Sequence, residues 1–85
     1  MIEIYKNELF GKTYYGLSNG YSVFADLVFV ETKKQFQAYV STVDYIKKKY
    51  TPEEKKLIRK LILDLVKPWN KNKKIIIHGL NIDFI

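Results

Sequence analysis

The chain has 85 residues, of which 47% are hydrophobic and 15% aromatic, and a net charge of +6, values typical of one basic folded domain with a single core. It contains no cysteine, so disulfides and thiolate metal sites are excluded. Its apolar runs are far shorter than the roughly 20 residues of a membrane-spanning helix, and its first residues lack a secretory signal pattern, so we expect a cytoplasmic protein that contacts no membrane.

The N-terminal part of the chain predicts strands and turns. Residues 2–5 alternate between isoleucine and other side chains, which predicts a short first strand at or near a sheet edge. The pair Phe10-Gly11 marks a turn, because glycine adopts backbone angles that other residues avoid. Residues 12–17 follow as a second strand, so the chain opens with a predicted β-hairpin.

A second turn and a third strand come next. Asn19-Gly20 is the strongest hairpin signal in the chain, because both residue types tolerate the positive φ angles of a type I′ turn. The third strand, over about 21–31, is apolar on both faces. This character predicts a central strand, or one whose second face meets a partner, and it permits a homodimer without requiring one.

The segment 35–46 can be interpreted as a strand or as a helix. As a strand it carries apolar side chains on both sides, whereas as a helix it places most of them within roughly 120° of the helical wheel. Thr32 and Gln35 have the spacing of a capping box. Lys47–Lys49 suit the negative end of a helix dipole. We therefore expect a first helix over about 33–49.

The clearest helix signal begins at Thr51. A capping threonine, Pro52 at the first helical position and Glu54 three residues after the cap satisfy the free amides of a first turn. The helix, over about 52–67, carries apolar residues at i, i+3 and i+4, which predicts one side facing a core. These residues are Leu57, Ile58, Leu61, Ile62, Leu65 and Val66.

Pro68 sets the end of this second helix. A proline disfavours helical geometry in the residue before it, so we expect the helix to stop at Lys67 and Trp69 to return to the core. After a polar linker, residues 76–84 alternate in a final strand, with a bulge expected at Gly79.

The elements together predict an α+β fold. Their order is β-β-β-α-α-β, and we expect a small antiparallel sheet packed against two helices, at about 33–49 and 52–67. The sequence shows no repeat and no composition change between segments, which predicts a single domain over residues 1–85.

Positive charge is concentrated in one part of the chain. The net charge is −1 for residues 1–46, +8 for residues 47–74 and −1 for residues 75–85. Local concentration of charge favours an anionic partner, although lysines on the outside of a helix are also typical of a plain solvated surface. The candidate partner-binding residues are Lys47, Lys48, Lys49, Lys56, Arg59, Lys60, Leu63, Lys67, Lys71, Lys73 and Lys74.

Signals for catalysis are weak. His78, the single histidine, lies on the apolar side of the final strand, which favours a hydrogen-bonded core or rim histidine over a catalytic base. Asp26 could pair with a lysine or with His78, and acid–base chemistry would need Asp26 and Asp83 together, which nothing in the sequence predicts. We expect a protein that is not an enzyme and that uses no cofactor and no metal.

Two functional classes remain. The first is a binding protein that docks on nucleic acid or a nucleoprotein through the lysine-rich helix, making phosphate contacts with little sequence discrimination because arginine is almost absent. Seven tyrosines could stack bases in such a complex, although they also suit an ordinary sheet surface.

The second class consists of small inhibitors or adaptors that phages and mobile elements direct against host proteins, anti-CRISPR proteins among them. The chain has 14 lysines, ten isoleucines and one arginine, which indicates an AT-rich coding sequence such as that of a low-GC bacterium or its phage. A basic inhibitor would act in the host cytoplasm on an acidic protein surface or a bound guide RNA.

Overall fold

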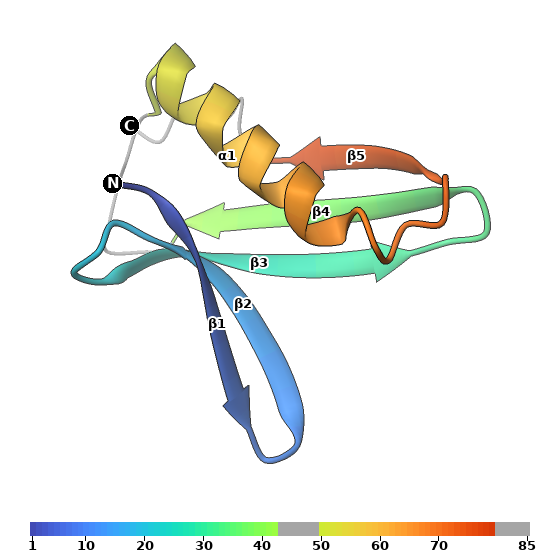
Figure 1. Ribbon diagram of the computed structural model, residues 1–85, viewed down its shortest axis with the longest axis horizontal. Helices are drawn as coiled ribbons and strands as arrows, with labels where there is room; N and C mark the ends of the chain where they lie inside the picture. The colour runs from blue at the N-terminus through green and yellow to red at the C-terminus, as the bar shows by residue number, and fades with distance from the viewer. Residues whose placement is uncertain (43–49, 80–85) are drawn as a thin grey trace.

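A computed structural model describes residues 1–42 and 50–79, which form a five-stranded sheet with a helix across one of its faces (Figure 1). The elements are β1 (Glu3–Leu9), β2 (Lys12–Ser18), β3 (Val23–Glu31), β4 (Gln35–Thr42), α1 (Pro52–Val66) and β5 (Lys74–His78). The strands lie in the sheet in the order of the chain, from β1 to β5. The first four pair antiparallel and β5 pairs parallel to β4, so α1 belongs to the crossover connection that a parallel pair requires.

The predicted fold class is wrong in two respects. The described residues contain one helix rather than two, and the sheet is mixed rather than antiparallel. The segment expected as a first helix over 33–49 is the strand β4 as far as residue 42, and residues 43–49 lie outside the described part of the chain. The element order is therefore β-β-β-β-α-β.

Thr32 explains why the helix prediction failed. Its Oγ1 accepts a hydrogen bond from the amide of Gln35 at 3.0 Å, as a capping threonine would. The amide of Thr32 also donates to the carbonyl of Gln35 at 2.8 Å, which closes a tight turn between β3 and β4. The same side-chain hydrogen bond occurs in helix caps and in turns, so the Thr-x-x-Gln spacing cannot distinguish them.

β4 also carries apolar side chains on both faces, which imitates a helical pattern. Phe36, Ala38 and Val40 are buried under α1, whereas Tyr39 lies on the opposite face. β4 pairs with β3 on one side and with β5 on the other, so its conformation is fixed by partners distant in sequence. Periodicity within the segment does not contain that information.

The turn predicted at Phe10-Gly11 is confirmed, whereas the type I′ turn predicted at Asn19-Gly20 is wrong. Phe10 and Gly11, with φ angles of 52° and 75°, form the two-residue loop with positive φ that is typical of type I′ turns. Asn19-Gly20 instead belongs to a four-residue loop, in which the Asn19 side chain accepts the two amides that follow Gly20 at 2.9 and 3.0 Å. β3 consequently begins at Val23, two residues later than predicted.

The predictions for the start and end of α1 are confirmed. Glu54 donates its amide to Thr51 Oγ1 at 3.1 Å, and the Glu54 carboxylate accepts the Thr51 amide at 3.0 Å. The helix ends at Val66, with Lys67 as its cap. Trp69 then returns to the core, where its ring centroid lies 5.5 Å from that of Tyr15 and 5.8 Å from that of Phe29.

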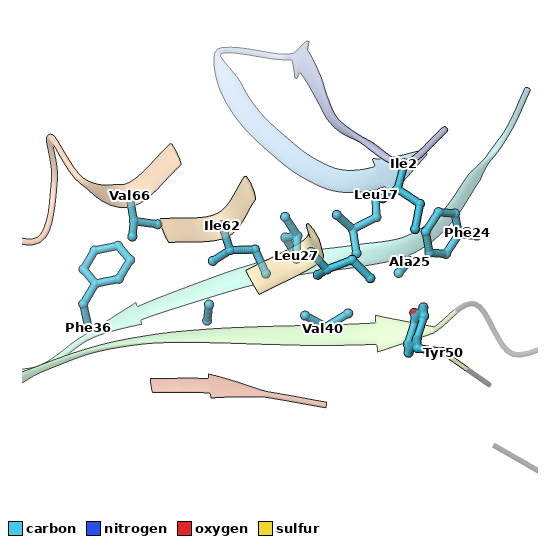
Figure 2. Packing of buried hydrophobic residues seen from close by; sticks show 12 residues of the cluster. Ile2, Leu17, Phe24, Ala25, Leu27, Phe36, Val40, Tyr50, Ile62 and Val66 are labelled. Carbon is cyan, nitrogen blue, oxygen red and sulfur yellow. The ribbon is translucent and has the colours of Figure 1, made fainter. Parts of the chain in front are cut away.

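The core lies between α1 and one face of the sheet, which we call the inner face. Ile58, Ile62 and Val66 of α1 are fully buried there, and Figure 2 shows Ile62 and Val66 pointing toward the strands. Leu57, expected to face the core, is exposed instead. The buried residues packed with these three are Ile2, Leu17, Phe24, Ala25, Leu27, Phe36, Ala38, Val40 and Tyr50.

The other side of the sheet, the open face, carries the alternate residues of each strand. Because successive strand residues point to opposite sides, these side chains lie away from α1. Several apolar residues on this face are exposed to solvent. Residues of the open face include Tyr5, Tyr14, Asp26, Val28, Val30, Gln37, Tyr39, Ile76 and His78.

Adjacent residues of α1 provide a test of this packing. Replacing Ile62 by alanine is expected to lower the free energy of unfolding by about 2–5 kcal/mol, because it leaves a cavity in the core. Replacing the exposed neighbour Leu63 by alanine is expected to change it by about 0.5 kcal/mol or less. Urea denaturation followed by circular dichroism measures both, and equal losses would contradict the assigned orientation of the helix.

Candidate functional site

The outer side of α1 presents a row of cations, which we call the basic stripe. It consists of Lys56, Arg59, Lys60 and Lys67, all exposed, with the exposed Leu63 between them. Lys56, Lys60, Leu63 and Lys67 follow one another at intervals of four, three and four residues, so they lie along one line on the helix surface. The row extends over about 16 Å, at 1.5 Å per residue.

The cations of the basic stripe have no carboxylate partners within the described residues. The ion pairs found there join Lys6 to Glu8 and Lys73 to Glu31. Asp64 lies one turn from Lys60 but makes no ion pair with it among the described residues. No ion pair within the described residues therefore offsets the positive charge of the basic stripe.

Lys73, another predicted site residue, has a structural role. Its ammonium group donates to the Glu31 carboxylate and, at 2.9 Å, to the carbonyl of Thr32. These bonds join the end of β3 to the segment that leads into β5. The hydrogen bond from Lys73, together with the charge of Lys73 and a smaller contribution from Lys71, lowers the pKa of Glu31. Lys73 is thus held in place and is not available to an external anion.

The remaining predicted residues are dispersed. Lys71 is exposed in the turn before β5, on the same connection as Lys73. Lys74 is exposed and lies beside Gln35, on the open face of the sheet, away from α1. Lys47, Lys48 and Lys49 lie outside the described residues. The structure therefore groups four of the predicted cations on the basic stripe and places three others, Lys71, Lys73 and Lys74, outside it.

The tyrosines do not join the basic stripe. Tyr14 and Tyr39 are exposed on the open face, whereas Tyr15 points inward and contacts Trp69. Tyr50 is buried against Phe24. Tyr14 and Tyr15 thus point to opposite faces, and the exposed rings of Tyr14 and Tyr39 lie on the face of the sheet away from α1 and its basic stripe. One nucleic-acid strand cannot use both without wrapping around the sheet.

His78 belongs to a polar cluster on the open face. Its ring stacks on Tyr39 with centroids 4.4 Å apart, and its Nε2 lies 3.0 Å from Gln37 Oε1. Tyr39 also donates its hydroxyl to Gln37 Oε1, at 2.9 Å. Asp26 takes no part, so the pairing considered between Asp26 and His78 is absent from the described hydrogen bonds, while the expected hydrogen-bonded rim histidine is found. The cluster contains no activated nucleophile.

The tip of the β1–β2 hairpin is a feature that sequence reasoning missed. Phe10 is 92% exposed and Leu9 is 49% exposed, at the end of a hairpin that projects from the sheet (Figure 1). Phe10 also has a φ of 52°, which is unfavourable for a bulky side chain. An exposed aromatic residue in a strained position is a candidate for contact with a partner. The sequence signal that could have identified this feature is the apolar pair Leu9-Phe10 at the predicted turn.

Other classes of site were considered. No group of three His, Asp or Glu side chains that could hold a metal ion occurs within residues 1–42 and 50–79. None of the described helices is long and apolar enough to span a bilayer. Comparison of the chain with protein-family models, with curated proteins and with solved structures finds no match. The case for a function therefore depends on the surfaces described above.

The Lys73–Glu31 contact gives a prediction about pKa. Replacing Lys73 by alanine should raise the Glu31 pKa toward its ordinary value, because the donated hydrogen bond and the adjacent charge are lost. Because the Glu31 pKa is lower in the folded state than in the unfolded state, the contact stabilises the protein at pH values above the ordinary carboxyl pKa. That stabilisation disappears as the pH falls through the lowered value.

Carbon-detected NMR titration of Glu31 measures the shift, and Lys71→Ala, which removes a weaker contribution, serves as the control. An unchanged pKa in Lys73→Ala would contradict the assignment.

The hairpin tip gives a second prediction. Asparagine tolerates positive φ, and Asn-Gly is the preferred type I′ pair, so Phe10→Asn should stabilise the isolated protein by about 0.5–1 kcal/mol. Thermal denaturation measures this effect, with Phe10→Ala as the control that removes the ring but keeps the strain. Destabilisation by Phe10→Asn would show that the ring contributes to the fold.

Proposed function

We propose that the protein is a non-catalytic binding protein that docks on nucleic acid, alone or within a nucleoprotein, through the basic stripe of α1. The observation that carries this proposal is the row of four exposed cations without carboxylate partners in the described residues. Such a row attracts closely spaced phosphates and releases their condensed counterions, which favours binding at low salt.

The composition of the stripe indicates how it would bind. Three of its four cations are lysines, which contact phosphate as flexible point charges, whereas bidentate recognition of guanine usually requires arginine. Arg59 is the single arginine of the chain. We therefore expect contacts to the backbone that fix position, with little discrimination between sequences.

A second candidate function is inhibition or adaptation of a host protein, as expected for a phage or mobile element. The exposed Leu9 and Phe10 at the projecting hairpin tip favour it, because a bulky apolar side chain presented to water is typical of an anchor that fills a partner's pocket. The two functions use different surfaces, so an experiment can separate them.

Salt dependence tests the main proposal. With about four phosphates engaged, the slope of log affinity against log salt for a 20-base-pair DNA should be about −4. Replacing Lys56, Lys60 and Lys67 by glutamine should weaken the slope to about −1, since three phosphate contacts are lost. Fluorescence anisotropy at several salt concentrations measures both slopes.

A matched variant controls for net charge. Lys12, Lys33 and Lys34 are exposed and lie outside α1, so their replacement by glutamine removes the same charge elsewhere. The slope of this control should stay near −4, and circular dichroism should show both variants folded. An equal change of the salt slope in the two variants would show that binding depends on the overall charge and not on the basic stripe. Absence of binding at about 50 mM salt would reject the nucleic-acid proposal in favour of the protein-binding one.

A further inference from the structure

β2 and β3 pair over only part of their length. Their register ends at Tyr15 opposite Leu27, although both strands continue beyond this point. Farther along, β2 pairs with β1 and β3 pairs with β4, and Figure 1 shows the β1–β2 hairpin turning away from the other strands. Residues 12–14 pair with β1 and residues 28–31 pair with β4, but within the described residues no strand pairs with the edges of these two segments that face each other. We call the space between them the β2–β3 notch.

The β2–β3 notch is an open cleft with a volume of about 500 Å³. On the helix side it is lined by Tyr15 and Phe29, and both rings pack against Trp69, with ring centroids 5.5 to 5.8 Å apart. These rings lie on the inner face of the sheet, beside the point where β2 and β3 separate. The residues that line the cleft are Thr13, Tyr14, Tyr15, Asp26, Leu27, Val28 and Phe29.

The narrow end of the notch is fixed by Gly16 and carries an unpaired charge. A Cβ on Gly16 would lie 2.7 Å from the carbonyl oxygen of Ala25, so the strands approach closely there. Asp26, opposite Gly16, lines the notch from the open face and is exposed. It makes no ion pair within the described residues. Tyr14 and Val28, about half exposed, complete this side of the notch.

We infer that the β2–β3 notch binds a short extended segment of a partner protein as an added strand. Unpaired strand edges present alternating N–H and C=O groups, which another strand matches and a nucleic acid does not. The longer free edge has four residues, or about 13 Å, which suits a segment of about five residues.

The side chains of the notch define the chemistry of that segment. Alternate residues of an added strand point to opposite faces, so some face the rings of Tyr15 and Phe29 and must be apolar. The residues of the added strand that point to the open face lie beside Asp26, whose negative charge complements a lysine or an arginine. The partner segment therefore alternates apolar residues with a basic one. This surface is separate from the basic stripe and does not depend on the function proposed for it.

A pair of peptides isolates the contribution of Asp26. The first probe is acetyl-Val-Lys-Val-Thr-Val-amide, and the second has glutamate in place of lysine. Because the protein carries a net charge of +6, nonspecific attraction would favour the glutamate peptide. Preference for the lysine peptide, with amide shifts in NMR spectra concentrated at residues 12–14 and 28–31, is the expected result.

Two substitutions and a modified peptide complete the test. Asp26→Lys should weaken binding of the lysine peptide about tenfold, since it replaces attraction by repulsion. Asp64→Lys makes the same charge change on α1 and should leave the affinity within about twofold. Methylation of alternate peptide amides should abolish binding, because an added strand needs those donors.

Several outcomes would overturn the inference. These are equal binding of the two peptides, unaltered binding of the methylated peptide, and amide shifts on α1 instead of the notch. Shifts at the notch that depend on protein concentration without peptide would assign it to a second copy of the chain. Shifts there on addition of an oligonucleotide would assign it to nucleic acid.

Discussion

Burial of one side of α1 against the inner face of the sheet is the contact on which the rest of the molecule depends. Ile58, Ile62 and Val66 lose all their exposure in this contact, and removing apolar area from water supplies most of the stability of a small domain. The described residues provide a single helix, which covers one face of the sheet. The open face and the outer side of α1 are therefore both left to solvent, and the possible functional surfaces follow from that arrangement.

Charge is distributed over these surfaces according to how each lysine is held. The lysines of α1 extend into solvent without partners in the described residues, whereas Lys73 is fixed by Glu31 and Thr32. The open face carries exposed tyrosine and valine side chains around Asp26. One side of the molecule is thus basic, and the other carries apolar side chains around a carboxylate. The two surfaces lie apart, so they can be tested separately.

Local signals predicted the parts of the fold that depend on nearby residues. The cap at Thr51 and the end of α1 before Pro68 result from interactions within a few residues, and the end of the helix lets Trp69 return to the core. The conformation of β4 was missed, because the bond from Gln35 to Thr32 occurs in caps and in turns, and because pairing with β3 and β5 is not encoded locally. The candidate site shows the same division. Exposure of the lysines on α1 followed from the helical period, but the pairing of Lys73 with Glu31, 42 residues away, did not.

The agreement between strand order and chain order has a consequence for synthesis. Each strand pairs with the one that precedes it, so an emerging polypeptide can extend the sheet by one strand at a time without waiting for distant segments. The last step differs, since β5 reaches the side of β4 only after the chain has crossed the inner face as α1. Any assembly of β1 to β4 that formed before this crossing would leave its apolar inner face exposed to water, and such exposed surfaces favour aggregation.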